Sequence, residues 1–566
     1  MQLSKMIDQA RGLEKADLVI RNCRVVNVLS GEIHESDVGI AGGIFLGFGD
    51  YKAERVFDAG GRFLLPGLVE GHIHIESTLL TPPHFAQAVA ARGTAAVVCD
   101  PHEIANVSGS AGVEYMLEVS RNLPVSIFFM FPSCVPATAL ETSGAVLSAG
   151  DFEHFRRLYP ERILGLAEMM NFPGVLAKDP EVLSKLEAAK GHRIDGHAPL
   201  LSGLDLNAYI LAGPRSDHEC SNTPEAMEKM RSGMHLMMRE GSLERNMEDL
   251  LGMVNDFNSQ NISIVTDDRN VLDLRENGHL DYGLRRAVAL GMDPVRAVQM
   301  VSINTARYFG LSGYGAIAPG FRANCFLVDD LKEFAVENVF IEGQFLEELC
   351  FESDAGFPPL SSMNIGSEID ESMFRPEEGR GNIRVIGVSR GQLLTENLEL
   401  EPLLEGGQPI ADPSRDICKL TVIERHTATG NRATGFVRGL GLSCGAIAGT
   451  VAHDSHNLVV AGMNDVDMVL AAREVARIGG GFTVVRSGEV LGTLSLPVAG
   501  LMSDKGLDEV AEAVRGLDRA TKQLGCSYNP FMQISFLALP VIPSLKLTDR
   551  GLVDVAAFDF TGLWVK

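Results

Sequence analysis

Between residues 62 and 311 the chain alternates short apolar runs with stretches of helical periodicity. Short apolar runs bounded by turn residues are typical of buried strands, and the stretches between them are typical of amphipathic helices. Strand and helix alternating over such a length predict a parallel sheet and suit a (β/α)8 barrel. The apolar runs include "AAVVCD", "VSIFFMFPS", "ILGLAEMM" and "ISIVTDD", and the helical stretches include "PEVLSKLEAAK", "LDLNAYILAG" and "PEAMEKMRSGM".

The segments on either side of this alternation have a different pattern. Residues 17–58 alternate apolar and polar side chains between Ser-Gly and Gly-Gly turns, and a β-like pattern returns after residue 310. We expect these two segments to pair as one small β domain that is split around the barrel. The predicted domains are the split β domain (1–61 and 312–350), the barrel (62–311), a connector rich in Pro, Ser, Gly and acid (351–380), and a further α/β or α+β domain (381–566).

Composition narrows the classes of partner. The 566 residues carry a formal net charge of -25, which argues against nucleic acid because phosphate binding needs a basic surface. The nine cysteines form no CxxC pair and their number is odd, so we expect free thiols in a reducing cytoplasm. No apolar run approaches the roughly 18 residues of a transmembrane helix, so we expect a cytoplasmic protein without a membrane partner.

Polar residues close the apolar runs at the positions where barrels of this kind carry their active sites. In "GHIHIEST", His72 and His74 lie at period two, so their side chains point to the same side, and Glu76 shares that parity. The later runs end with or lead into Asp100, His102 and Glu103, then Glu168, His197, His218 and Asp267.

Each of these residues has an ordinary interpretation when taken alone. A single histidine at a strand end is more often a hydrogen-bonded residue than a metal ligand, and Glu168 alone could be a salt-bridge partner. Four histidines and two carboxylates at successive strand ends would need that interpretation to hold for all six independently. His, Glu and Asp together suit Zn, Mn or Fe. The sequence therefore predicts a metal site in which His72 and His74 form half of one ion's ligand shell.

The run "PGLVEGHIHIEST", followed by strand-end His, His and Asp, resembles the amidohydrolase superfamily of metal-dependent hydrolases. Within that superfamily, "CDPHEIANVSG", "AEMMNFPGV", "DGHAPLLSGLDLNAYILAGPRSDHE" and "TDDRN" closely resemble the adenine deaminases. The similarity covers most of the barrel and continues into the C-terminal domain. It implies hydrolytic deamination of adenine to hypoxanthine and ammonia through attack of a metal-activated hydroxide at C6. Adenine is then the small-molecule partner, and we also expect a homodimer.

The resemblance also implies a role for each candidate ligand. Glu168 stands where many relatives carry a carboxylated lysine, and a glutamate likewise supplies the two oxygens and the negative charge that a bridge between two ions needs. We therefore expect two divalent metal ions per chain. Manganese is the metal that we expect, and iron and zinc are the alternatives. By this resemblance His72, His74 and Asp267 would bind the first ion, His197 and His218 the second, Glu168 would bridge them, and Asp267 would also be the proton-transferring base.

A second proton-transferring group is expected, because ring N1 and the departing amine both gain protons. Glu103 and His102 are the first candidates, although Glu103 could instead only order the "PHEIANVSG" loop. Glu76, Ser77 and Glu219 are candidate substrate contacts.

Three alternatives remain open at this point. The enzyme could deaminate another aminopurine, or it could be a cyclic amidohydrolase of the dihydroorotase or hydantoinase kind, although those relatives usually carry a modified lysine where this chain has Glu168. A non-catalytic interaction protein on the same fold is the third. In "AHDSHN", His453, Asp454 and His456 form either a surface turn or a loop that reaches the barrel mouth, shields the substrate or holds a further metal.

Overall fold

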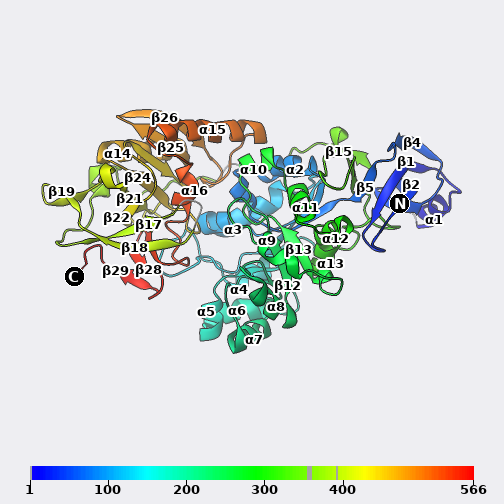
Figure 1. Ribbon diagram of the computed structural model, residues 1–566, viewed down its shortest axis with the longest axis horizontal. Coiled ribbons are helices and arrows are strands. Elements are labelled where there is room, and N and C mark those ends of the chain that lie inside the picture. The colour runs from blue at the N-terminus through cyan, green and yellow to red at the C-terminus, as the bar shows by residue number, and fades with distance from the viewer. Residues whose placement is uncertain (1–2, 354–359, 390–392, 566) are drawn as a thin grey trace.

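The computed structural model describes residues 3–353, 360–389 and 393–565. The molecule is elongated, with a β-rich unit at one end, an α/β unit in the middle and a second β-rich unit with long helices at the other end (Figure 1). Residues 354–359 of the predicted connector lie outside the described residues. In the part of the connector that is described, η5 (Glu371–Phe374) buries Met373 and Phe374 in the core of the C-terminal unit.

The N-terminal unit is a sheet assembled from both sides of the central unit. Its strands follow the order β16-β15-β14-β5-β1-β2-β3, with β4 paired to β1. Strand β5 runs antiparallel to β14, so residues far apart in sequence share one sheet. The core includes Phe45, Leu64 and Phe340, all fully buried. The elements are α1 (Leu3–Ala10), β1 (Ala16–Asn27), β2 (Glu32–Ala41), β3 (Ile44–Phe48), β4 (Ala53–Asp58), β5 (Phe63–Pro66), β14 (Cys325–Val328), β15 (Val336–Ile341), β16 (Gln344–Phe345) and η4 (Leu346–Glu348).

The central unit has a mixed α/β content with a curled parallel sheet. Five strands pair in the order β10-β9-β8-β7-β6 and three in the order β11-β12-β13, every pair being parallel. These strands are apolar and buried along nearly their whole length, as expected for a parallel sheet covered on both faces. They are β6 (Leu68–Ile73), β7 (Thr94–Cys99), β8 (Ser126–Phe131), β9 (Ile163–Met169), β10 (Arg193–Gly196), β11 (Ser216–Asp217), β12 (His235–Arg239) and β13 (Ile262–Val265).

Two backbone contacts link the two groups of strands. Arg215 N donates to Ile194 O at 2.9 Å beside β10, and Asp267 N donates to His72 O at 2.9 Å beside β6. The second contact accompanies a parallel bridge between Ile73 and Asp267. The first and last strands of the central unit therefore lie side by side, which brings the ends of β6 and β13 together.

Helices follow the central strands and begin at residues suited to that position. Asn222 caps α8 by accepting a hydrogen bond from Glu225 N, and Asp179 caps α6 ahead of Pro180. The helical segments are α2 (Pro82–Ala90), α3 (His102–Val119), α4 (Ala149–Leu158), α5 (Phe172–Ala177), α6 (Pro180–Ala188), α7 (Gly203–Ala212), α8 (Thr223–Arg231), α9 (Met247–Leu250), α10 (Val271–Glu276), α11 (Leu280–Ala289), α12 (Pro294–Met300) and α13 (Ile303–Phe309), with short turns η1 (Ile75–Thr78), η2 (Leu251–Met253) and η3 (Ser259–Asn261).

The C-terminal unit is built on a sheet in the order β18-β17-β22-β21-β24-β23-β25-β26. Only the β17–β22 pairing is parallel among the neighbouring pairs of this path, so the unit is of the α+β kind. Its elements are β17 (Ile383–Val388), β18 (Thr395–Leu400), β19 (Leu403–Glu405), β20 (Gln408–Ile410), η6 (Pro413–Arg415), β21 (Ile417–Ile423), β22 (Arg432–Arg438), β23 (Ala446–Gly449), β24 (Leu458–Gly462), α14 (Asp465–Arg477), β25 (Gly481–Arg486), β26 (Glu489–Ser495), α15 (Leu507–Gln523), α16 (Pro530–Ser535), β27 (Leu545–Thr548), β28 (Gly551–Asp554) and β29 (Asp559–Thr561).

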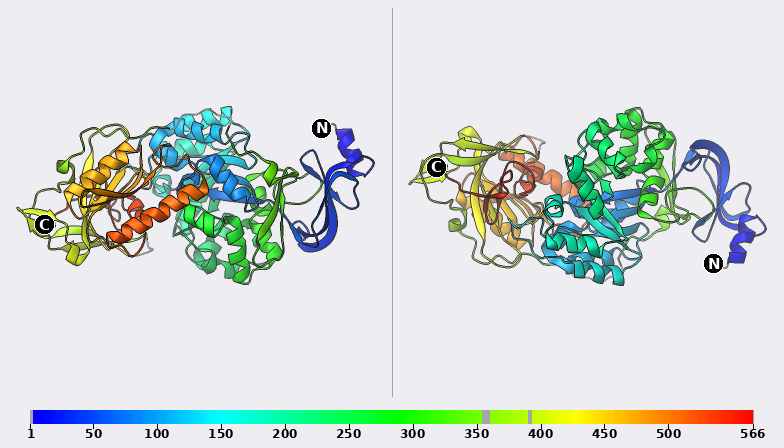
Figure 2. Two further views of the ribbon diagram at one scale, coloured as in Figure 1. Left: turned by 90° about the horizontal axis from the view of Figure 1, so that it is seen from above. Right: turned by 90° about the horizontal axis from the view of Figure 1, so that it is seen from below.

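The C-terminal unit packs against the loops of the central unit, and α15 reaches from the C-terminal unit to the central unit, where it contacts α10 and α2 (Figure 2). Ser503 N donates to Leu79 O at 2.8 Å, and Thr142 N donates to Asp549 Oδ1 at 2.9 Å. These contacts join the C-terminal unit to loops that follow β6 and β8. Within the described ranges, no helix combines the length and the apolar character needed to cross a bilayer.

Candidate metal centre

The carboxyl ends of five central strands deliver the predicted ligands to one place. His72 lies within β6 and His74 just after it, Glu168 lies near the end of β9, and the remaining three follow β10, β11 and β13. Gly196 lets β10 and β11 approach closely, since a Cβ there would meet the Ser216 carbonyl oxygen. Each of the six predicted ligands belongs to a group of side chains whose ligand atoms all lie within 4.8 Å of one another. The six are His72, His74, Glu168, His197, His218 and Asp267.

Glu168 lies at the centre of this arrangement, and its two carboxylate oxygens face different histidines. Oε1 lies 3.3 Å from His74 Nε2 and 3.7 Å from His72 Nε2. Oε2 lies 2.6 Å from His197 Nδ1 and 3.2 Å from His218 Nε2. One carboxylate therefore contacts both histidine pairs, which also meet directly where the His72 and His218 rings stack with their centroids 4.3 Å apart.

Asp267 closes the first half of the centre. Its Oδ1 lies 3.4 Å from His72 Nε2 and 3.2 Å from His74 Nε2, and Arg239 Nη1 donates to its Oδ2 at 3.0 Å. The residue has a φ of 56°, a left-handed conformation that aspartate tolerates better than most residues. Arg239 also pairs with Glu219, whose Oε1 lies 3.6 Å from His197 Nδ1 and 3.4 Å from His218 Nε2, so Glu219 belongs to the same charge network.

The donor atoms fit a cation. His74 Nδ1 lies 3.0 Å from the Asp100 carbonyl oxygen, which can only accept, so Nδ1 carries the proton and Nε2 turns its lone pair toward the carboxylates of Glu168 and Asp267. His72 Nε2 is buried and makes no hydrogen bond to any residue that the structure describes. Lone pairs facing carboxylate oxygens need a positive charge between them, and imidazole with carboxylate suits a divalent transition metal.

The carboxylates at this centre are held in their charged form. Burial raises the pKa of Glu168, but the adjacent histidines, His218 first among them, outweigh burial and hold that pKa well below its usual range. Burial opposes ionisation of Asp267 in the same way, and the adjacent His72 and His74, together with the charge on Arg239, hold its pKa well below the ordinary value. The centre therefore concentrates negative charge that a divalent cation would neutralise.

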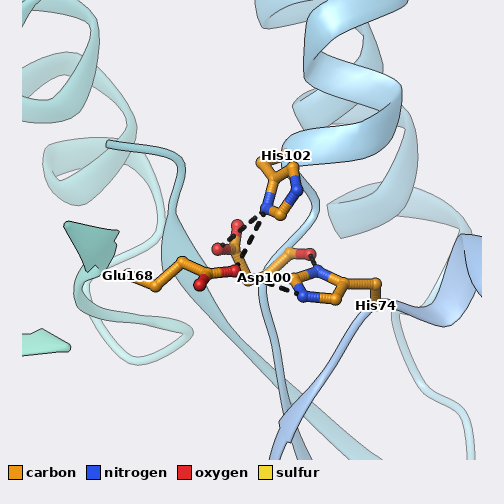
Figure 3. Close-up of side chains that lie close together, drawn as sticks. All are labelled: His74, Asp100, His102 and Glu168. Carbon is orange, nitrogen blue, oxygen red and sulfur yellow. Dashed lines mark hydrogen bonds and ion pairs between the residues drawn. The ribbon is translucent and has the colours of Figure 1, made fainter. Parts of the chain in front are cut away.

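Asp100 and His102 lie beside the first half of the centre (Figure 3). His102 Nδ1 lies 3.2 Å from Asp100 Oδ2 and 3.6 Å from Glu168 Oε1, while Nε2 lies 3.5 Å from Glu103 Oε1. Sequence reasoning singled out His102 and Glu103 but gave Asp100 no role, although it directly ends the apolar run of β7. Arg239, which ends β12, was missed as well, and the same strand-end rule would have found it.

The remaining candidates lie around the edge of the centre. Glu76 is buried, accepts from Ile104 N at 3.1 Å through Oε1, and has a pKa raised to about 7, mainly by burial. Ser77 donates a hydrogen bond to Asp268. Glu76 therefore fixes the first turn of α3 and Ser77 fixes the segment after β13, and both residues lie next to predicted ligands.

The "AHDSHN" segment is not a surface turn. His453 and His456 are buried, with 8 % and 1 % of their surfaces exposed, and both contact Glu103 of the central unit. His453 Nδ1 lies 2.6 Å from Glu103 Oε1, and His456 Nε2 meets the other oxygen of the same carboxylate. Of the two interpretations, the structure has the loop that reaches the central unit, where it contacts the first turn of α3 beside the metal centre.

The chain belongs to a known class of hydrolases. The model of the amidohydrolase family matches residues 63–346, which include all the predicted ligands, and this class implies a divalent metal cofactor.

Comparison with known proteins identifies the family within this class. The model of the adenine deaminase C-terminal domain matches residues 392–559. Curated relatives named adenine deaminase include one from Oleidesulfovibrio alaskensis, 54% identical over 564 residues, and one from Desulfatibacillum aliphaticivorans, 47% identical over 568 residues, each covering 99% of both chains. A third, adenine deaminase 2 of Carboxydothermus hydrogenoformans, is 47% identical over 98% of both chains. The chain therefore belongs to the adenine deaminase family.

Proposed function

We propose that this chain hydrolyses adenine to hypoxanthine and ammonia. The family relationship supports the substrate, and the position of Glu168 between two pairs of histidines supports hydrolysis at a metal centre. Water replaces the exocyclic amine at C6, so one C–N bond breaks and one C–O bond forms. Of the alternatives, a cyclic amidohydrolase is disfavoured because no lysine stands where Glu168 does.

We further propose that the eight central strands close into a (β/α)8 barrel. We also propose that the centre holds two divalent ions, with manganese as the first choice of metal. The backbone contacts beside β6 and β10 support closure. His72, His74 and Asp267 would hold one ion, His197 and His218 the other, and Glu168 would bridge them. Bound there, such ions supply a hydroxide at neutral pH, since a metal lowers the pKa of its water from 15.7 to about 7.

Asp267 is proposed as the group that moves the nucleophile's proton. Arg239 occupies Oδ2 of its carboxylate, which leaves Oδ1 on the side of His72 and His74. A carboxylate that is fixed in this way accepts a proton from the attacking water and returns it to ring N1 or to the departing amine.

His102 and Glu103 are proposed as the second proton-transferring pair. His102 faces Glu168 and Asp100 through Nδ1 and Glu103 through Nε2, so the imidazole joins the centre to a second buried carboxylate. Adenine carries an amine that leaves as ammonia, and this pair would supply its additional proton.

The test of this function is the identity of the products. Protein stripped of metal and reloaded with manganese is incubated with adenine, and ammonia and hypoxanthine are quantified together. The proposal predicts equal amounts of both. Ammonia from another aminopurine but not from adenine would move the substrate within the same reaction class, and release of neither product with opening of a cyclic amide would contradict the proposed reaction.

A further inference from the structure

A loop of the C-terminal unit, residues 452–457, enters the region of the metal centre. It connects β23 to β24, and every residue in it is buried. The loop is fixed from behind by two residues that follow β21: His426 Nε2 lies 2.7 Å from Ser455 O, and the fully buried Arg425 donates from Nε to His456 O at 2.5 Å. A buried loop with its carbonyls occupied in this way has a defined position.

The front of the loop is fixed on Glu103 of the central unit. His456 Nδ1 accepts a hydrogen bond from Ala452 N at 3.1 Å, so in the neutral imidazole Nε2 carries the proton and donates to Glu103. A nitrogen that carries a proton has no lone pair for a metal ion. The contacts of His453 and His456 with Glu103 therefore form a hydrogen-bonded clamp between the two units rather than a third metal site.

Asp454 lies between the two clamping histidines. Only 4 % of its surface is exposed, and its Oδ2 is buried without a hydrogen-bond partner among the residues that the structure describes. The carboxyl is close enough to His102, Glu103 and Glu168 for their charges to act on it. Leaving a buried carboxyl oxygen unpaired is costly, and such a group inside a binding site commonly finds its partner in the ligand.

We infer that Asp454 is a substrate-binding residue, through which the C-terminal unit holds a ring N–H of the purine beside the metal centre. This inference rests on the proposed function for the identity of the ligand. Adenine and hypoxanthine both carry an N–H on the five-membered ring, and a carboxylate is the acceptor that such a donor pairs with most strongly. The loop then has two parts: its histidines dock on Glu103, and its aspartate contacts the substrate.

The test compares Asp454→Asn with the parent protein. The amide keeps the shape of the side chain and removes its charge. We expect KM for adenine and the dissociation constant of hypoxanthine, measured by calorimetry, each to rise at least tenfold, since a hydrogen bond to a charged group contributes about 1.5–3 kcal/mol. The metal content and the melting temperature should stay at the parental values, and Asp454→Glu should recover part of the lost affinity.

Asp504→Asn is the matched control. It makes the same change in the C-terminal unit at an exposed carboxylate that pairs with Lys505. It should leave hypoxanthine binding unchanged. Parental KM and hypoxanthine affinity in folded, metal-loaded Asp454→Asn would overturn the inference, and so would loss of metal from that variant. If the parent protein bound hypoxanthine without deaminating adenine, the proposed function would fail while the binding comparison still decided the role of Asp454.

Discussion

At the scale of single residues, the centre depends on carboxylates that are fixed by their neighbours. Asp267 has one oxygen occupied by Arg239 and the other turned toward His72 and His74. Asp267→Asn should lower kcat by about 10² to 10⁴, the usual loss for a positioned proton-transferring group, because an amide cannot accept the proton. Steady-state kinetics of metal-loaded protein measures this, and a kcat within threefold of the parent would remove Asp267 from its role.

Glu168 carries the second prediction at this scale. Its two oxygens face different histidine pairs, and glutamine would keep the shape of the side chain while offering one oxygen and no charge. Glu168→Gln should therefore nearly abolish turnover even with metal in excess. Measurement of turnover against added manganese checks this, and recovery of parental activity at high manganese would show that the bridge is dispensable.

At the scale of elements, β12 carries a buried histidine whose titration opposes folding in acid. Burial lowers the pKa of His235 to about 3, and the ring lies 2.9 Å from Ser263 Oγ. In the unfolded chain His235 takes up a proton with a pKa near 6.5, whereas in the folded chain it does so only near pH 3. The free energy of unfolding is therefore unaffected by this group above about pH 6.5 and falls as the pH drops from 6.5 toward 3. His235→Gln should flatten the fall in melting temperature between these limits relative to the parent. An identical pH profile for both proteins would contradict this.

The ends of strands and helices have local sequence signals, whereas contacts between distant units do not, and this difference decided which features could be predicted. Strand-end position indicated His72, Glu168 and Asp267, because parallel strands end at one edge of a sheet and the apolar runs mark where each strand ends. A helix such as α6 begins where Asp179 and Pro180 allow it, a local signal. The contact between His453 and Glu103 spans 350 residues and two units, and no local pattern specifies it. Sequence reasoning therefore indicated the residues that the structure brings together at this centre, and it left the role of the C-terminal loop open.

At the scale of the whole molecule, the clamp on Glu103 makes the central and C-terminal units depend on each other. His456→Ala would leave one oxygen of the buried Glu103 carboxylate without its hydrogen-bond donor. This should lower the free energy of unfolding by about 1–3 kcal/mol. We expect a lower melting temperature and a kcat/KM reduced at least tenfold, with metal content unchanged. His84→Ala is the control, because His84 crosses the same boundary to Asp504 O at an exposed position. Equal behaviour of the two variants would show that the clamp has no effect on the reaction.

We propose that the reaction depends on two divalent ions held on either side of Glu168, and a metal titration tests this proposal most directly. Manganese is added stepwise to metal-free protein while bound metal and ammonia release from adenine are measured on the same samples. The proposed centre predicts that turnover reaches its plateau at two bound ions per chain. A plateau at one ion, or full turnover before any metal binds, would contradict the bridged centre.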